Sequence, residues 1–499
     1  MTNIARRNKL ILSALAVLFL FIYIFSYPRP ASIDLVYGCN DPTNAISPSF
    51  IEDFLERGSF QHPVPYYGVY PENITIAFTP RDGAQYGGYI VPKYSLGMFI
   101  FSVPFAFLFK NFLLVYMPIM AVLVVVALYI FARDMFNERV ALTSAIFAFV
   151  LPTIWVCANE ILYGDLPACF FFLLGIIYLN RKSYTLSALL FSISVAFRYP
   201  QLMLVALAYL FEIWRGMSLR NLVSSGMIGI IPAIPLVLLN KDLYGSYLTT
   251  GYQVEAANVQ AVLGSDVAKS FAIQFRPDFI YQYASMYIFG VLALLFLGIF
   301  LGLRKNRPSF AIVSFVITFL YYGSHSSWGL NTYAINAAIL RYLLIPLLLL
   351  IPVFANYIIH TSRKRVAFLL AGCYIIISIM ATVYLPDGII DTYDQVAQGV
   401  RTHDIVMQST EPNSVIITPF DDKKLYPDRN TLTAAYLAAI EPSDPEGDRF
   451  WEYPLDYSVI RQKATYLKNT GIAVYFLGVP LKQISELRPK IINETLYKI

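Results

Sequence analysis

Charged residues and cysteines are both scarce in this 499-residue sequence. Asp, Glu, Lys and Arg together make up 14% of the chain, whereas a soluble domain contains roughly 25%. Hydrophobic residues make up 57%, and the mean hydropathy is +0.57. The four cysteines are scattered, so they predict neither a disulfide framework nor a paired-cysteine metal site. This composition excludes an ordinary soluble domain and predicts a polytopic membrane protein.

Sequence motifs for nucleotides and metals are missing as well. Neither a Walker A sequence nor a dinucleotide-binding glycine fingerprint occurs, which argues against an ATP or nucleotide-sugar site. The four histidines stand alone, without HExxH or His-pair spacing. We therefore expect no metal site, and a divalent cation is only an open alternative. The net charge of +5 does not indicate nucleic-acid binding, because basic connectors between apolar runs account for the excess.

Apolar runs long enough to cross a membrane recur along the chain. They lie near 10–27, 112–131, 140–157, 165–180, 184–199, 200–214, 221–240, 285–303, 308–323, 340–359 and 366–385. A further apolar segment, 95–109, is short for a span, which is typical of a re-entrant or juxtamembrane segment.

Six short basic connectors predict the topology. They are Arg6/Arg7/Lys9, Arg133/Arg139, Arg181/Lys182, Arg215/Arg220, Arg304/Lys305/Arg307 and Arg363/Lys364/Arg365. If 95–109 does not cross, all six lie on one side, which the positive-inside rule makes cytoplasmic. The sequence then predicts about 11 transmembrane helices in a cell membrane, with the N-terminus cytoplasmic and the C-terminus extracytoplasmic. We expect the first run to be a retained signal anchor, because no small-residue cleavage site follows it.

Three polar segments then fall on the extracytoplasmic face. Residues 28–94 form a first external loop and residues 241–284 a second, both within a transmembrane domain of residues 1–385. Residues 386–499 form a soluble domain, in which each of two candidate strands follows a helix-like stretch. These candidate strands are 414–420 and 473–480. The predicted fold is an all-α polytopic membrane bundle with a small extracytoplasmic α/β C-terminal domain.

Three acidic residues at the outer face are candidates for chemistry. Asp41 follows the first apolar run by about 14 residues, where its carboxylate could act as a general base toward an acceptor hydroxyl. Alternatively, Asp41 caps a turn, as Asp-Pro pairs often do. Glu160 and Asp165 lie between two apolar runs without a neighbouring Lys or Arg. Carboxylates near a membrane face are costly and often functional, although solvated turn residues are the alternative.

Three cations at the same face are candidates for phosphate binding. Lys93 precedes the segment 95–109, Arg198 lies in a tight external turn, and Arg341 begins the tenth apolar run. Arginine suits bidentate phosphate binding, and lysine can neutralise a phosphate as a point charge. The alternative for each side chain is snorkelling to lipid headgroups.

Taken in order, these segments resemble the GT-C superfamily of integral-membrane glycosyltransferases. The branch is similar to dolichyl-phosphate-mannose–protein mannosyltransferases and bacterial aminoarabinose transferases. Five stretches carry the resemblance: Asp41 with PSFIEDFLERGSF, VPKYSLGMFIFSVP, LYGDLPACFF, NKDLYGSYLTTGY and AILRYLLIP. They cover roughly residues 34–350. Two features depart from the family pattern: Pro42 replaces the usual second acid, and the WWD motif of oligosaccharyltransferases is missing.

The resemblance implies transfer of a monosaccharide from a polyprenyl (dolichyl or undecaprenyl) phosphate. Asp41 would take the proton from the acceptor hydroxyl, and direct displacement would invert the anomeric configuration. Arg341, Lys93 and Arg198 would hold the donor phosphate as it leaves, while Asp165 or Glu160 would orient the donor sugar or the acceptor. A lipid, a glycan or a protein would be the acceptor. The other expected partners are membrane lipids, and no nucleic acid is expected.

Two other classes of function remain as alternatives. A lipid-linked-glycan flippase or other transporter would place its functional charges near the bilayer midplane, whereas these charges cluster at the outer edge. A non-catalytic membrane scaffold whose soluble tail binds a partner is the second alternative. The sugar, the acceptor and the oligomeric state do not follow from the sequence.

Overall fold

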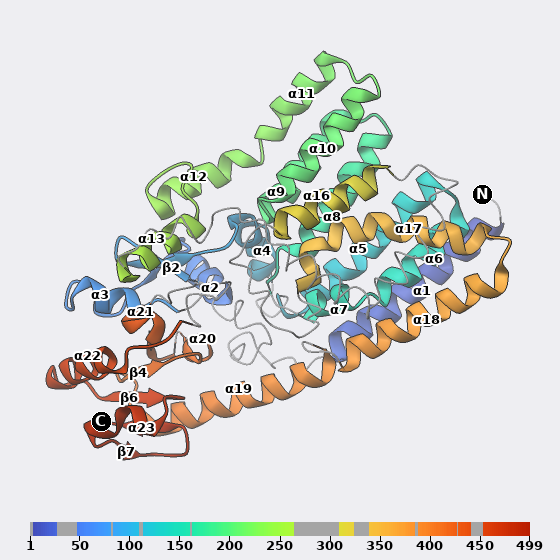
Figure 1. Cartoon of the computed structure of the whole chain (residues 1–499). Helices are drawn as coiled ribbons and strands as arrows, with labels where there is room; N and C mark the ends of the chain where they lie inside the picture. Colours follow the sequence, from blue (N-terminus) through green and yellow to red (C-terminus); the bar gives the residue numbers. More distant parts are fainter. Residues whose placement is uncertain are drawn as a thin grey trace.

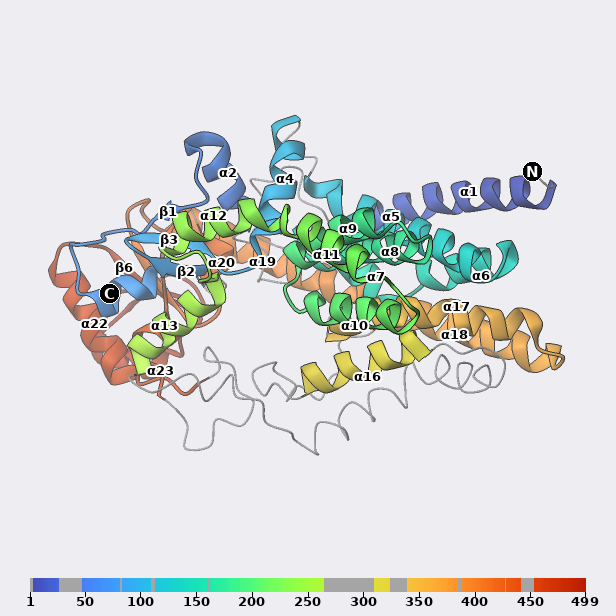
Figure 2. The same ribbon diagram turned by 90° about the horizontal axis from the view of Figure 1, so that it is seen from above.

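The computed structural model describes residues 3–26, 47–80, 83–108, 113–159, 162–263, 309–323, 339–384, 388–426, 428–440 and 453–499. A bundle of apolar helices forms one end of the molecule, and a small sheet near the C-terminus lies at the other end (Figure 1). The same division is visible from above in Figure 2. The mostly helical architecture with a small C-terminal α/β region agrees with the predicted fold class.

The bundle has helix in every predicted apolar run that the structure describes. The helices are α1 (Asn3–Phe25), α5 (Leu113–Met135), α6 (Glu138–Phe149), α7 (Pro152–Asn159), α8 (Asp165–Asn180), α9 (Tyr184–Phe197), α10 (Gln201–Trp214), α11 (Leu219–Ile230), α12 (Ala233–Tyr244), α16 (Ser309–Gly323), the 3₁₀ turn η7 (Ile339–Leu343), α17 (Leu344–His360) and α18 (Lys364–Tyr384). The predicted run at 285–303 lies outside the described residues.

Several of these helices have the length and apolar composition of membrane spans. Within the described part of the chain, five helical segments are long and apolar enough to cross a membrane, and α6 with α7, bent by 57°, would make a sixth. Helices α8, α9 and α10 are apolar but only 14 to 16 residues long. At a rise of about 1.5 Å per residue they are shorter than a hydrocarbon core of about 30 Å. The predicted count of about 11 spans is therefore not confirmed, and the orientation of the termini stays a prediction.

Helices α8 and α9 pack closely because small residues face each other. The Ser187 hydroxyl donates to the Gly175 carbonyl at 2.8 Å, and the Ser194 hydroxyl donates to the Ala168 carbonyl at 2.8 Å. A Cβ at Gly175 would lie 2.6 Å from the Phe191 ring. Small residues and hydroxyl side chains are the usual means of close helix packing in membranes. This contact fixes the start of α8 beside the end of α9.

The segment 95–109 forms the short helix α4 (Leu96–Leu108). In Figure 2, α4 runs across the direction of α1 instead of alongside it. A Cβ at Gly97 would lie 2.4 Å from the carbonyl oxygen of Ala196, so only glycine lets the start of α4 lie on the last turn of α9. This orientation of α4 agrees with the juxtamembrane segment that the sequence predicts. Whether α4 crosses the membrane stays a prediction.

The described parts of the two loops that are predicted to be external form a layer at the same end of the molecule as the C-terminal sheet (Figures 1 and 2). The layer contains α2 (Ser47–Arg57), α3 (Glu72–Thr75), η3 (Ile76–Phe78), α13 (Gly251–Leu263) and an antiparallel sheet ordered β1 (His62–Pro63), β3 (Tyr89–Pro92), β2 (Gly83–Tyr86). The Asn258 side chain accepts from the Gln85 N–H at 2.8 Å and donates to the Gln85 carbonyl at 3.1 Å. This amide satisfies backbone groups at the edge of β2, and thereby ties the second external loop to the first.

The C-terminal region is reached through α19 (Ile389–Ser409), which extends from the bundle toward the sheet in Figure 1. The five strands are ordered β5 (Asn430–Thr433), β4 (Val415–Thr418), β6 (Val474–Leu477), β8 (Leu496–Lys498), β7 (Lys490–Ile491), of which β5, β4 and β6 are parallel. The associated helices are α20 (Asp422–Leu425), α21 (Ala434–Ala438), α22 (Tyr457–Asn469), α23 (Leu481–Ile484) and the 3₁₀ turn η9 (Ser485–Leu487).

Both candidate strands of the soluble region are strands in the structure. They are β4 and β6, and every residue of each is buried. Complete burial is expected of parallel strands that are covered on both faces. The predicted domain boundary at 385–386 falls in residues 385–387, outside the described part of the chain, and stays a prediction.

Candidate functional site

Three of the charged residues that the sequence singled out lie at one end of the bundle. Asp165 is the first residue of α8, Arg198 directly follows α9, and Arg341 lies in η7 just before α17. Arg198 and Asp165 form an ion pair whose side chains are only 13% and 7% exposed. Breaking a largely buried ion pair leaves uncompensated charges away from water, which is costly. The pairing therefore holds both side chains in place.

A glycine makes the Arg198–Asp165 ion pair possible. Gly164 precedes α8, and a Cβ at this position would lie 2.7 Å from the carbonyl oxygen of Phe197, the last residue of α9. A larger residue at 164 would push the two chain segments apart. The sequence Gly164-Asp165 therefore sets the carboxylate directly against the turn that carries Arg198.

Two tyrosine rings organise the arginines. The guanidinium carbon of Arg341 lies 4.6 Å from the centroid of the Tyr163 ring and 5.0 Å from that of Tyr342. The guanidinium carbon of Arg198 lies 4.9 Å from the same Tyr342 centroid, and Nη2 of Arg341 donates to the Tyr342 hydroxyl at 3.1 Å. Such cation–π contacts favour a cation over the ring face. Tyr342 thus brings both guanidinium groups to one place.

Lys93 lies in the neighbouring layer and has an acidic partner. Its Nζ donates to Oε1 of Glu255 at 2.7 Å, and both side chains are largely buried. Burial raises the pKa of the Glu255 carboxyl, and the charge and hydrogen bond of Lys93 oppose this shift. Lys93 therefore stabilises the charged form of a carboxyl group that burial destabilises.

The backbone around Lys93 is fixed by the second external loop. Gly251 begins α13, and a Cβ there would lie 2.2 Å from the Pro92 carbonyl oxygen and 2.6 Å from Cα of Lys93. The Tyr244 hydroxyl donates to the same Pro92 carbonyl at 2.7 Å. Only glycine permits this approach, which places Glu255, one turn further along α13, opposite Lys93.

Glu255 is a residue that the sequence analysis missed. A single glutamate on a polar loop carries no signal of its own. The one hint is positional, because Glu255 follows the stretch NKDLYGSYLTTGY by three residues. The start of α4 connects the two groups of charges: Lys93 is four residues before Gly97, which lies against Ala196 near Arg198.

Two predicted site residues, Asp41 and Glu160, lie outside the described residues. Their roles as general base and as orienting carboxylate stay predictions. Among the residues that the structure does describe, no group of three His, Cys, Asp or Glu side chains could hold a metal ion. The alternative of a divalent cation likewise stays a prediction.

A second charged cluster connects the first external loop to the C-terminal region. Asp53 pairs with Arg57 and with Nδ1 of His62, the latter at 3.1 Å. The His62 ring lies edge-on to that of Tyr426, with centroids 5.1 Å apart. Burial and, to a smaller extent, the nearby charge of Arg57 lower the pKa of His62 to about 4. His62 is therefore neutral at physiological pH and bonds Asp53 as a neutral ring.

Direct hydrogen bonds complete this junction. The Thr433 hydroxyl donates to the Thr79 carbonyl at 3.0 Å and is 3.2 Å from Oδ2 of Asp422. Asp422 and Thr433 are both fully buried. A buried polar network of this kind is stable only when its members are satisfied, so the C-terminal region is held in one position over the external loops.

Comparison with known proteins identifies the fold. No protein-family model matches the chain, and no curated protein matches it in sequence. Among solved structures, the chain is similar to ArnT from Cupriavidus metallidurans, in the apo state and bound to undecaprenyl phosphate, with a TM-score of 0.58 at 11% identity over 98% of this chain and 97% of that chain.

The archaeal oligosaccharyltransferase AglB from Archaeoglobus fulgidus is also similar. Its complex with an inhibitory peptide and a dolichol-phosphate matches with a TM-score of 0.54 at 10% identity, over 94% of this chain and 69% of that chain. Both proteins are GT-C glycosyltransferases. The resemblance stated from the sequence is thus confirmed at the level of the fold.

Proposed function

We propose that this protein is a membrane glycosyltransferase that moves a monosaccharide from a polyprenyl phosphate to a lipid, glycan or protein acceptor. The observation that carries the proposal is the gathering of Asp165, Arg198 and Arg341 at one end of a GT-C-like bundle. The similarity to ArnT, a protein solved with undecaprenyl phosphate, supports a donor of this class.

In this proposal Arg341 and Arg198 bind the donor phosphate. A planar guanidinium can donate two parallel hydrogen bonds to phosphate oxygens. The Tyr163 and Tyr342 rings hold the guanidinium groups before the donor arrives, so little reorganisation is needed as charge develops on the leaving phosphate. The Asp165 ion pair makes this carboxylate a positioning group for Arg198. Orientation of the sugar or acceptor by Asp165 or Glu160 remains part of the proposal.

Lys93 supplies a third positive charge that is able to change partner. In the structure it is paired with Glu255. When a phosphate approaches, Lys93 can turn toward it, and the raised pKa of Glu255 eases protonation of the carboxyl that is left behind. This exchange would avoid stranding an uncompensated buried charge.

Asp41 is the proposed general base. It takes the proton of the acceptor hydroxyl while that oxygen attacks the anomeric carbon. The bond from the anomeric carbon to the phosphate oxygen breaks, and polyprenyl phosphate leaves as the anion. A single displacement of this kind inverts the anomeric configuration.

Release of polyprenyl phosphate by the purified full-length protein tests the proposal. The protein is offered a panel of polyprenyl-phosphate monosaccharides, with membrane extract as the source of acceptor. Asp41→Asn is compared with wild type and with Asp404→Asn, a control whose carboxylate lies on α19 and is 59% exposed. We expect release by wild type and the control but not by Asp41→Asn.

Two other outcomes are informative. Equal release by all three proteins would keep the transferase and remove Asp41 as its base. No release from any donor, by protein that is folded and binds the lipid, would overturn the proposal in favour of a lipid-linked-glycan transporter.

A further inference from the structure

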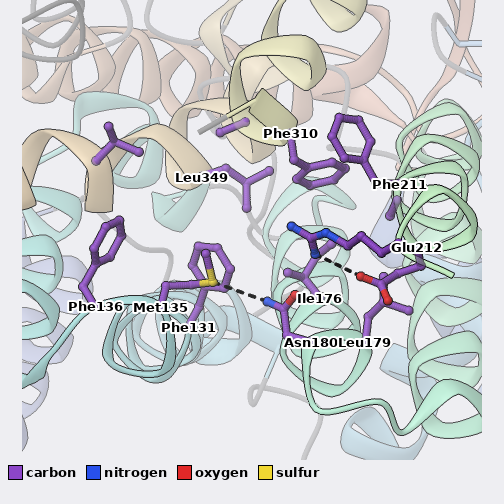
Figure 3. A pocket seen from close by; sticks show the side chains of 14 residues that line it. Phe131, Met135, Phe136, Ile176, Leu179, Asn180, Phe211, Glu212, Phe310 and Leu349 are labelled. Atoms are coloured by element: carbon purple, nitrogen blue, oxygen red, sulfur yellow. Dashed lines mark hydrogen bonds and ion pairs between the residues drawn. The ribbon is translucent and has the colours of Figure 1, made fainter. Parts of the chain in front are cut away.

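A cavity of about 260 Å³ lies at the other end of the bundle. Its walls come from α5, α8, α10, α16 and α17, and Figure 3 shows Phe131, Ile176, Phe211 and Leu349 lining it. The polar side chains of the lining are Asn180, Glu212 and Arg215. An apolar cavity of about 150 Å³ is enough to bind benzene, so this one accepts several methylene groups of a hydrocarbon chain.

The cavity is far from the candidate transfer site. Asn180 is the last residue of α8, whereas Asp165 is the first. At a rise of about 1.5 Å per residue, these two positions are roughly 22 Å apart along the helix. The cavity lies at the helix ends that carry the connectors Arg133/Arg139, Arg181/Lys182 and Arg215/Arg220, the end where lipid headgroups of one leaflet are expected.

A buried carboxylate fixes two exposed cations beside this cavity. Glu212 is 1% exposed and accepts from Nζ of Lys182 at 2.6 Å and from Nη1 of Arg215 at 3.0 Å. The side chains of Lys182 and Arg215 are 55% and 52% exposed. Because one carboxylate neutralises only one of the two cations, a net positive charge remains on these exposed side chains.

A second carboxylate is also shared by two cations, and this second cluster adds to the net positive charge. Asp134 pairs with both Arg133 and Arg181. Met135 of the cavity lining directly follows Asp134 in the sequence, and Lys182 directly follows Arg181. These two clusters together hold four cations against two carboxylates. An apolar cavity next to a positive rim at headgroup level matches one class of ligand, which carries a hydrocarbon chain and an anionic head.

We propose that this cavity binds one anionic phospholipid of the adjacent leaflet, with part of an acyl chain inside and the phosphate at Lys182 and Arg215. The far end of a polyprenyl chain is also apolar, but it carries no charge and would make no use of these cations. The inference stands independently of the proposed transferase activity, because it concerns the opposite end of the bundle.

Native mass spectrometry of the full-length protein tests this site. The protein is reconstituted in vesicles of phosphatidylcholine and phosphatidylglycerol at 4:1, and the lipids that stay bound on release are counted. We expect wild type to retain one phosphatidylglycerol in preference to phosphatidylcholine. Arg215→Gln should lower that occupancy about 5-fold, the effect of one basic residue on an anionic lipid. The matched control Arg220→Gln changes an exposed arginine outside the lining and should leave it unchanged.

A second variant fills the cavity without changing charge. Ala208 lines it and is buried, so Ala208→Leu should reduce retention of phosphatidylglycerol. Retention of the two phospholipids in the vesicle ratio, or equal occupancy in Arg215→Gln and Arg220→Gln, would overturn the proposal. The proposal would also be overturned if Ala208→Leu lost added undecaprenyl phosphate and kept phosphatidylglycerol. That result would assign the cavity to a prenyl chain.

Discussion

Each end of the bundle buries a carboxylate against cations, but the two ends treat the cations differently. Counted over the whole residue, Asp165 and Glu212 are 5% and 1% exposed. The side chain of Arg198, the partner of Asp165, is only 13% exposed, whereas the partners of Glu212, Lys182 and Arg215, are about half exposed. Chemically similar ion pairs therefore differ in whether the positive charge is kept away from water.

The difference has a physical consequence. A buried cation has lost its hydration and interacts strongly with any anion that enters, which suits binding and stabilisation of a leaving phosphate. An exposed cation keeps its hydration and interacts weakly with many anions, which suits contact with lipid headgroups. The comparison predicts that substitutions at the first end are costly and that those at the second are mild.

The largest expected effect is on stability at Asp165. Asp165→Asn leaves Arg198 buried beside a neutral amide, and breaking a buried pair from one side costs about 3–5 kcal/mol. The matched control is Asp134→Asn, which affects partly exposed pairs and should cost at most about 1 kcal/mol. Thermal unfolding in detergent measures both, and equal shifts of Tm would remove the contrast between the two ends.

The next effect is on transfer activity at Arg341. If Arg341 binds the leaving phosphate, Arg341→Gln should lower kcat/KM for transfer at least about 100-fold, as loss of one charge-stabilising donor does. Arg341→Lys should recover only part of this loss, because lysine has no planar pair of donors. Arg181→Gln, at the exposed end, serves as the control and should keep its activity. Comparable losses in Arg341→Gln and Arg181→Gln would refute the assignment.

A further effect concerns the pH dependence of stability in the layer that contains His62. The folded-state pKa of His62 is about 4, below the ordinary value of roughly 6.5. The unfolded chain therefore binds more protons between these values, and stability is full above pH 6.5 and falls as the pH approaches 4. The slope from this residue is at most about 1.4 kcal/mol per pH unit.

Tm measured from pH 7 to pH 4 checks this prediction. The decline should be shallower in His62→Asn than in wild type, because the substitution removes the titrating ring. Parallel curves for the two proteins would show that His62 titrates alike in the folded and unfolded chains.

The smallest effect is expected at Lys182. Lys182→Gln leaves Glu212 with Arg215 as a partner at 3.0 Å, and an ion pair with a half-exposed cation is worth at most about 1 kcal/mol. The change in Tm should be well below that of Asp165→Asn. A loss as large as that of Asp165→Asn would mean that Lys182 is the main counter-charge of Glu212 and that the two ends are alike.

The apolar runs of the sequence correctly predict where the described helices lie, because the length of a membrane helix is imposed by the bilayer. Two details required the structure. The run 140–157 is two helices, α6 and α7, which meet at a bend of 57°. Pro152 accounts for the break, because its ring disfavours helix in the preceding residue. The run 221–240 is likewise divided into two helices, α11 and α12, with the break at residues 231 and 232.

In the candidate site, the sequence likewise predicts some features and only the structure shows the others. The sequence singled out Asp165, Arg198, Arg341 and Lys93, because charges at the edge of apolar runs stand out. It gave no sign that Asp165 pairs with Arg198, 33 positions away, or that Glu255 pairs with Lys93, 162 positions away. Such pairings depend on which helix ends the fold brings together, as at Gly164 and Gly251, and no local pattern records them.

The membrane character of the chain, the positions of its apolar helices and the charges at the helix ends all follow from the amino-acid sequence. These properties follow from local composition, since a helix in lipid satisfies its own backbone and only its length and polarity matter. Which of those charges are buried together, and which stay exposed around a cavity, depends on how the helices pack. That outcome depends on close contacts between segments far apart in the chain, and the same charges in another packing would bind differently.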